Sequence, residues 1–266
     1  MTSQVPRTKY HVPVALIGLL LGTAGCQDTF YPLKNRITPG LDPFVVFAAE
    51  GQAGSRELWA SHTGGGRAYQ LTYTLGDESA PALSPTGAVL AFLRSTGRAD
   101  SAGRRVWFMN LTTGAERDLP ALPDSSIPSR LAFSGDGATL YARSPSGLWA
   151  LPTPPSAYAA RRLSAADSAA ADSALTVFIG DPPFARIAAC KVRTGWICAF
   201  PPGNEEAPLQ EGGVDPLRWG SDSVGYLVGD RLVVRSGGAG RSREVMWTGV
   251  PPHPESPTYA PAAPLP

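Results

Sequence analysis

Lysine is scarce in this chain of 266 residues, and positive charge is not clustered. Lysine occurs at Lys9, Lys34 and Lys191, the arginines are scattered, and the formal net charge is +1. Nucleic-acid binding needs clustered Lys and Arg to displace counterions, so this composition argues against a surface that coats a polyanion. We therefore expect no nucleic-acid partner.

Histidine is also rare, and the usual catalytic motifs are missing. Beyond the N-terminal segment the histidines are His62 and His253, and neither has a Cys, Asp or Glu partner at metal-ligand spacing. The sequence contains no Gly-x-Ser-x-Gly elbow and no phosphate-binding loop. We therefore expect no metal site, no cofactor and no catalytic residue set.

No apolar run is long enough to cross a membrane, which takes about twenty residues. The apolar segment Val12–Leu21 follows Arg7 and Lys9 and precedes the small residues 22–25. A charged region, a short apolar region and a small-residue cleavage site are the layout of a secretory signal. We expect residues 1–25 to be that signal.

The end of this segment, LGTAGC, resembles the lipobox of bacterial lipoproteins, although Thr23 stands where that family usually has Leu. The resemblance implies that Cys26 is acylated and becomes the new N-terminus of an exported, membrane-anchored envelope protein, periplasmic or at the cell surface. Stable anchoring would need more than one acyl chain. The alternative is a secreted protein cut near Ala24 with Cys26 unmodified.

Cys190 and Cys198 remain, and an exported protein meets an oxidising environment. If residues 193–195 form a three-residue hairpin loop, Cys190 lies opposite Cys198 on the partner strand. We expect a cross-strand disulfide, with two buried free thiols as the alternative.

Turn-forming residues are abundant, with 29 Gly and 27 Pro, which favours many short strands. The clearest unit, residues 78–120, reads as four strands at 80–83, 88–93, 106–109 and 116–119. Related units recur along the chain, marked by Trp59, Trp107, Trp149 and Trp196 in the third strand. A period of about 40–50 residues with four strands per unit is typical of propeller blades.

The stretches ALSPTGAVLAFLRS and AFSGDGATLYARS resemble the TolB-type β-propeller repeat, a relative of WD repeats, over roughly Val45 to Thr248. Thr86 stands where that family prefers Asp, and Pro182 where it has the turn Gly. The resemblance implies an all-β propeller of four-stranded antiparallel blades. We count five units over residues 44–250, with six blades as the alternative, and a tether over 26–43.

Unit one lacks an innermost strand, and the tail at 251–266 offers one. ESPTYAPAAP, from Glu255, is similar to ESAPALSPTG of the clearest unit. Because an open ring leaves strand edges exposed, we expect Ser256–Ala260 to form the inner strand of blade 1. The alternative is a disordered proline-rich tail.

Several other features have a structural interpretation beside a functional one. Residues 165–175 are either a short surface helix capped by Ser164 or Asp167, or a linker. Asp136 and Asp222 are expected to cap turns and not to bind calcium, which takes six to eight oxygens. The repeated tryptophans are expected to form core between blades.

Loops entering the innermost strands should gather at the central channel, where propellers usually bind. They carry Glu78, Arg130, Asp215 and Arg218, of which the last three are our candidate binding residues. The alternative is that these are solvated charges. The sequence favours a lipid-anchored protein-interaction or scaffold module with envelope proteins as partners. A glycan or small-molecule binding propeller is the alternative, and a propeller hydrolase or lyase is third.

Overall fold

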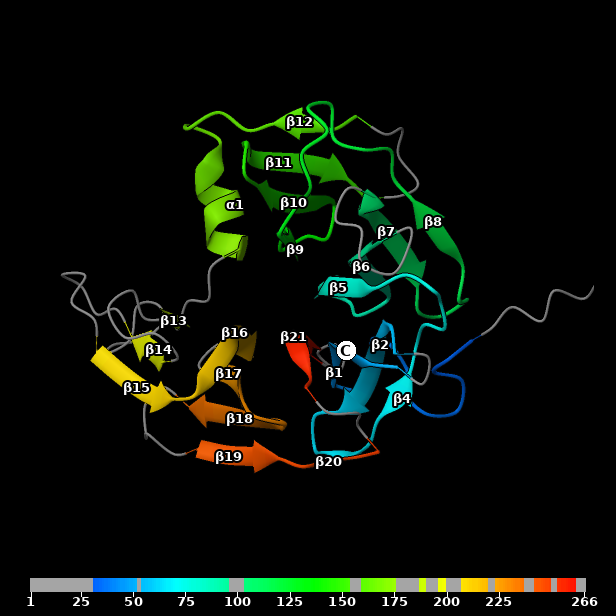
Figure 1. Ribbon diagram of the computed structural model, residues 1–266, viewed down its shortest axis with the longest axis vertical. Helices are drawn as coiled ribbons and strands as arrows, with labels where there is room; N and C mark the ends of the chain where they lie inside the picture. Colours follow the sequence, from blue (N-terminus) through cyan, green and yellow to red (C-terminus); the bar gives the residue numbers. More distant parts are fainter. Residues whose placement is uncertain are drawn as a thin grey trace, which may run out of the picture.

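Antiparallel sheets stand round a central axis (Figure 1). The computed structural model describes residues 31–51, 54–95, 103–153, 159–175, 187–189, 196–199, 207–219, 223–236, 242–249 and 253–261. Among these residues, four sheets have four antiparallel strands and one has three. The sheets correspond in order to the five predicted units. The predicted all-β propeller is therefore confirmed.

Within each blade the strands lie side by side, in order from the centre of the ring to its rim (Figure 1). From the centre outward, blade 1 contains β21 (Glu255–Ala260), β1 (Phe44–Glu50), β2 (Arg56–His62) and β4 (Tyr69–Gln70), and blade 2 contains β5 (Glu78–Leu83), β6 (Val89–Arg94), β7 (Arg105–Asn110) and β8 (Glu116–Asp118). Blade 3 contains β9 (Arg130–Phe133), β10 (Thr139–Ser144), β11 (Gly147–Pro152) and β12 (Arg161–Arg162). Blade 5 contains β16 (Gly213–Trp219), β17 (Ser223–Val228), β18 (Arg231–Ser236) and β19 (Ser242–Val245).

The described part of blade 4 has three strands, β13 (Ile187–Ala189), β14 (Trp196–Ala199) and β15 (Ala207–Glu211). Its expected inner strand falls largely on residues outside the described ranges. In the β13–β14 pair, Ala188 lies opposite Cys198. The expected register, with Cys190 opposite Cys198, is therefore wrong by two residues, because it assumed a three-residue loop.

Tight turns link the innermost strand of a blade to the next strand. In the turn at Ser84–Gly87, the Gly87 amide donates to the Ser84 carbonyl (2.8 Å), and Gly87 has a φ of +69° that suits glycine. In the matching turn of blade 3, Asp136 accepts hydrogen bonds from the Ser134 hydroxyl (2.6 Å) and the Ala138 amide (3.0 Å). The expected capping role of Asp136 is confirmed, whereas Asp222 lies outside the described residues. We call the face of the ring that carries these turns the turn face, and the face where the innermost strands begin the start face.

The hydrophobic core lies between neighbouring blades. Trp59 and Trp149 are buried there, as are the residues that precede the turns, Leu83, Phe133 and Trp219. The tryptophan repeat therefore marks core positions at these blades, as the sequence predicted.

The C-terminal strand β21 closes the ring by pairing with β1 in the order Phe44↔Ala260, Val45↔Tyr259 and Val46↔Thr258. The Thr258 hydroxyl accepts a hydrogen bond from the Leu83 amide of blade 2 (3.2 Å). The ring of Tyr259 stacks on Trp219 of blade 5 at a centroid distance of 4.6 Å. Closure by a C-terminal strand, predicted from the similarity of two short sequences, is confirmed.

A second closure at the rim was not predicted. Strand β20 (Trp247–Thr248) pairs in parallel with β3 (Gly66–Arg67), and Trp247 stacks on Phe47 with the ring centroids 4.3 Å apart. Strand β3 begins directly after a turn in which the Gly65 amide donates to the His62 carbonyl (3.0 Å).

Residues 31–43 lie against blades 1 and 2 near the turn face. Leu33 and Ile37 are buried in the core cluster that contains Leu83, and His62 Nε2 donates to the Arg36 carbonyl (2.9 Å). The expected tether at 26–43 is therefore not free of the folded body over its described part.

One helix, α1 (Ser168–Leu175), is described, and it lies beside blade 3 (Figure 1). The Asp167 amide donates to the Ser164 hydroxyl (3.3 Å) in the turn that leads into the helix, so the helix alternative, with Ser164 as its cap, is correct. Among the described residues, no helix has the length and apolar character that crossing a membrane requires.

Candidate binding channel

A cavity of about 1170 Å³ runs between the innermost strands. All three predicted binding residues, Arg130, Asp215 and Arg218, line it. The walls come from β5, β9, β16 and β21, with contributions from α1 and β14. Their apolar residues include Pro81, Leu131, Phe133, Ala170, Ala174, Val214, Pro216, Pro257 and Tyr259.

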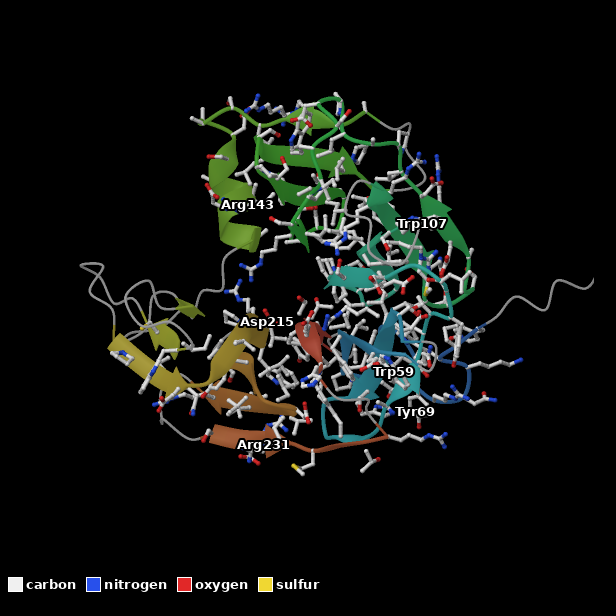
Figure 2. All side chains as sticks on the ribbon, in the orientation of Figure 1. Trp59, Tyr69, Trp107, Arg143, Asp215 and Arg231 are labelled. Carbon is white, nitrogen blue, oxygen red and sulfur yellow. The ribbon has the colours of Figure 1, made fainter. Side chains whose placement is uncertain are left out.

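Blade 3 packs closely against blade 2, and among the described residues its other face is only partly buried. In β10, Leu140 and Ala142 are buried against blade 2, whereas Tyr141 is half-buried and Arg143 is exposed. Arg143 pairs with Asp172 of α1 at 2.7 Å. Figure 2 shows Arg143 beside α1 and Asp215 on the opposite side of the central opening.

Arg130 lies directly opposite Arg143 in the β9–β10 pair. Like charges at opposite positions on neighbouring strands are destabilising. Enclosure by the channel walls lowers the pKa of the Arg130 guanidinium and the charge of Arg143 lowers it further, while the Asp215 carboxylate raises it. Arginine stays protonated in proteins even so, and Arg130 therefore brings a fixed positive charge into the channel.

Neither Arg130 nor Arg218 forms a hydrogen bond or ion pair within the part of the chain that the structure describes. The side chain of Arg218 is exposed at the end of β16 that lies near the turn face. Asp136, which also lines the channel, is occupied by its own turn. The channel thus presents free guanidinium donors but carboxylates that already accept hydrogen bonds.

Asp215 takes part in ring closure. Its carboxylate accepts a hydrogen bond from the Ser256 amide of β21 (2.7 Å). Asp215 itself has a φ of +50°, and Ala80 and Ser256 have φ values of 48° and 47° at corresponding irregularities of β5 and β21. Each of the three precedes a proline. A left-handed residue other than glycine costs about 1–3 kcal/mol, so the inner edge of the ring holds local backbone strain.

Glu78 does not belong to the channel, contrary to its place among the loop residues considered above. It is fully buried and pairs with Arg94 (2.6 Å), which also pairs with Glu116 (2.6 Å). Burial and a hydrogen bond with Glu57 raise the pKa of Glu78 to about 8, against the hydrogen bonds from Thr74 and Arg94. One buried oxygen of Glu57 and one of Glu78 have no hydrogen-bond partner within the described residues.

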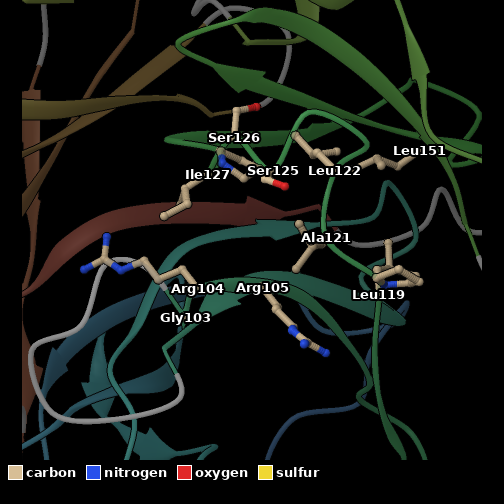
Figure 3. Close-up of a pocket in the computed structure, with 13 residues that line it drawn as sticks. Gly103, Arg104, Arg105, Leu119, Ala121, Leu122, Ser125, Ser126, Ile127 and Leu151 are labelled. Atoms are coloured by element: carbon tan, nitrogen blue, oxygen red, sulfur yellow. The ribbon is translucent and has the colours of Figure 1, made fainter.

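A smaller pocket of about 310 Å³ lies between blades 2 and 3 (Figure 3). Arg104 and Arg105 form one side, and Leu122, Ser125 and Ile127 form another. Its volume is at the lower limit for sites that hold small molecules. The wider central channel is therefore the stronger candidate.

The cysteines are the remaining candidate residues. Cys198 is disulfide-bonded, but Cys190 and Cys26 lie outside the described residues, so the pairing of Cys190 with Cys198 and the acylation of Cys26 stay predictions. Within the described ranges, no three His, Cys, Asp or Glu side chains gather closely enough to hold a metal ion.

No protein-family model and no curated protein matches this chain. Solved structures do match: a chain of the nidogen/laminin complex is 9% identical, covers 83% of this chain and 99% of that chain, and has a TM-score of 0.52. TolB from Acinetobacter baumannii is 14% identical over 87% of this chain and 70% of its own, with a TM-score of 0.44. The Cps50 (Swd1) β-propeller domain from Myceliophteria thermophila is 11% identical over 77% of this chain and 72% of its own, with a TM-score of 0.34. At these identities a likeness speaks for the fold alone, and the chain is a β-propeller.

Proposed function

We propose that this protein is an exported β-propeller, anchored at the bacterial envelope through acylated Cys26, that acts as a protein-interaction module. The observation that supports this function is the open central channel lined by Arg130, Asp215 and Arg218. Its volume of about 1170 Å³ exceeds the roughly 300–1,000 Å³ of most small-molecule sites. A segment of a partner protein fits such a channel better than a small ligand does.

The position of residues 31–43 supports an orientation in which the start face is open to partners. These residues lie near the turn face, where a side chain on Gly40 would be 3.5 Å from the Thr86 carbonyl oxygen. Tyr31 follows Cys26 by five residues, and an extended chain spans at most about 18 Å over that length. An acylated Cys26 would therefore hold the turn face toward the membrane.

Exposed apolar side chains at the start face are consistent with a protein partner. Tyr73 and Leu75, in the segment that leads to β5, are 61% and 76% exposed, and Val214 is 46% exposed near the start of β16. Exposed apolar and aromatic groups are common where proteins bind one another.

Quantitative capture from envelope extract tests the interaction. We expect a partner that is recovered by the parent protein and by Arg231→Ala to be reduced about tenfold or more with Arg218→Ala. Arg231 is a matched control because it is an exposed arginine of the same blade, paired with Glu244 at 3.0 Å. The captured protein must also recover this chain in the reverse experiment. Equal recovery by all three variants would contradict the proposal, and a sugar that raises the melting temperature would favour the glycan-binding alternative.

Incorporation of labelled palmitate tests the anchor separately. We expect label in the parent chain and none in Cys26→Ser, because acylation needs the thiol of that residue. Equal labelling of the two proteins would contradict lipidation of Cys26 and leave the interaction proposal to be judged on the capture experiment.

A further inference from the structure

The arrangement of charges in blade 3 leaves one arginine without compensation. Arg130 and Arg143 face each other across β9 and β10, and α1 supplies a carboxylate, Asp172, to Arg143. Within the described ranges Arg130 forms no such ion pair, and the Asp215 carboxylate across the channel compensates its charge only in part. An anionic group bound in the channel would supply the missing charge, because opposite charges at this position relieve the repulsion.

The chemistry of the lining favours a carboxylate. The described lining contains two carboxylates, Asp136 and Asp215, which accept hydrogen bonds from Ser134, Ala138 and Ser256. The guanidinium groups of Arg130 and Arg218 keep their donors free. Because a guanidinium matches a carboxylate with two parallel hydrogen bonds, recognition here would rest on directed hydrogen bonds and not on a large net charge.

The two arginines lie at different depths of the channel. Phe133 and Trp219 both end innermost strands just before a turn. Arg130 precedes the first of these strand ends by three residues, and Arg218 precedes the second by one. The offset is two residues, which corresponds to about 7 Å along a strand. In an extended peptide, residues two positions apart are separated by this distance.

We propose that the channel binds an acidic peptide segment in an extended conformation, whose carboxylates, two residues apart, reach Arg130 and Arg218. The proposal rests on the proposed function and names the chemistry of the partner segment. Apolar walls that include Tyr141, Val214 and Tyr259 would contact the remaining atoms of the segment. A free inorganic anion would leave these walls uncovered.

Isothermal titration calorimetry with defined peptides tests this site. The probe is an eight-residue peptide of alternating Ser and Glu, acetylated and amidated at its ends, and the control peptide has Gln in place of Glu. We expect the Glu peptide to bind the parent protein and Arg231→Gln equally. Arg130→Gln and Arg218→Gln should each weaken binding about tenfold, since each removes a charge-assisted hydrogen bond. Neither variant should melt below the parent, because both side chains are exposed and Arg130→Gln removes a repulsion between like charges.

Three results would overturn the proposal. The first is equal affinity of the parent protein for the Gln and Glu peptides, and the second is equal binding of the Glu peptide by Arg231→Gln and the two channel variants. The third is tighter binding of inorganic phosphate than of the peptide at Arg130 and Arg218, which would assign the site to a small anion. If the Glu peptide does not bind while Arg218→Ala still loses the captured partner, the acidic segment is wrong and the interaction function stands. If neither peptide binding nor partner capture depends on the channel arginines, both proposals are wrong.

Discussion

Blade 1 is buried on both faces, whereas blade 3 is buried on one. In β1, Val45 and Phe47 pack toward blade 5, and Val46 and Ala48 pack toward blade 2. In β10, alternate residues pack toward blade 2, and the others, including Arg143, face α1 and the channel. Strands apolar throughout are typical of two covered faces, and alternation is typical of one. The comparison predicts that the closure region contributes more to the stability of the ring than blade 3 does.

Removal of β21 should have the largest effect. A chain that ends at Pro254 loses the pairing with β1, the Tyr259–Trp219 stack and the hydrogen bonds to Asp215 and Leu83. We expect the melting temperature to fall by about 10 °C or more, because a protein of this size loses about 2–4 °C for each kcal/mol. Calorimetry measures the change, and a chain that ends at Pro261 is the control. An unchanged melting temperature in the shorter chain would contradict a larger contribution of the closure region to stability.

A large-to-small substitution should cost more in the closure region than in blade 3. Phe47 is fully buried and stacks on Trp247, so Phe47→Ala should lower the free energy of unfolding by about 3–5 kcal/mol. Tyr141 is half-buried at the channel, and Tyr141→Ala should cost about 1 kcal/mol or less. Denaturant titration gives both values, and equal losses would contradict the comparison.

The buried carboxyl pair makes the interface of blades 1 and 2 sensitive to pH. The pKa of Glu78 is raised from 4.5 to about 8, so the folded state binds more protons than the unfolded state between these values. The contribution is therefore fully present below pH 4.5 and is lost as the pH rises toward 8, by about 1 kcal/mol for each pH unit. Denaturant titrations at several pH values should show this slope in the parent and in Glu116→Gln but not in Glu78→Gln. The same slope in all three proteins would exclude Glu78 as its source.

The smallest effect is expected where α1 covers blade 3. Asp172 and Arg143 are about half exposed, at 50% and 45%, and exposed ion pairs contribute about 0–1 kcal/mol. Asp172→Ala should therefore change the melting temperature little. It should strengthen binding of the acidic peptide, because it leaves a second uncompensated arginine beside Arg130. Weaker peptide binding in this variant would show that α1 takes part in the site differently.

The blades could be predicted from the sequence because their turns are local. Pro85 and Gly87 determine a turn within four residues. Apolar residues at the positions of Leu83 and Trp107 recur in other blades at the blade period. The closing strand could be predicted because its sequence is similar to that of the inner strand of blade 2. The structure shows the same local conformation in both, since Ala80 and Ser256, each followed by a proline, have φ values of 48° and 47°.

Other contacts between distant residues escaped prediction. No local sequence pattern indicates the parallel pairing of Trp247 with Gly66 or the burial of Leu33. Arg130, Asp215 and Arg218 were predicted at the channel as residues of the loops that enter the innermost strands. All three line the channel, but they lie within strands β9 and β16. The roles of Arg143 and Asp172 required the register of β9 with β10, which the sequence does not show.

A designed disulfide tests the closure of the ring most directly. In a Cys26→Ser background, Val46→Cys with Thr258→Cys introduces thiols at directly paired positions of β1 and β21. Val45→Cys with Thr258→Cys is the matched control, since neighbouring residues of a strand point to opposite faces. Mass spectrometry of the oxidised protein should find the designed disulfide in the first pair and not in the second. Equal cross-linking of both pairs, or of neither, would contradict closure by β21 and the channel that depends on it.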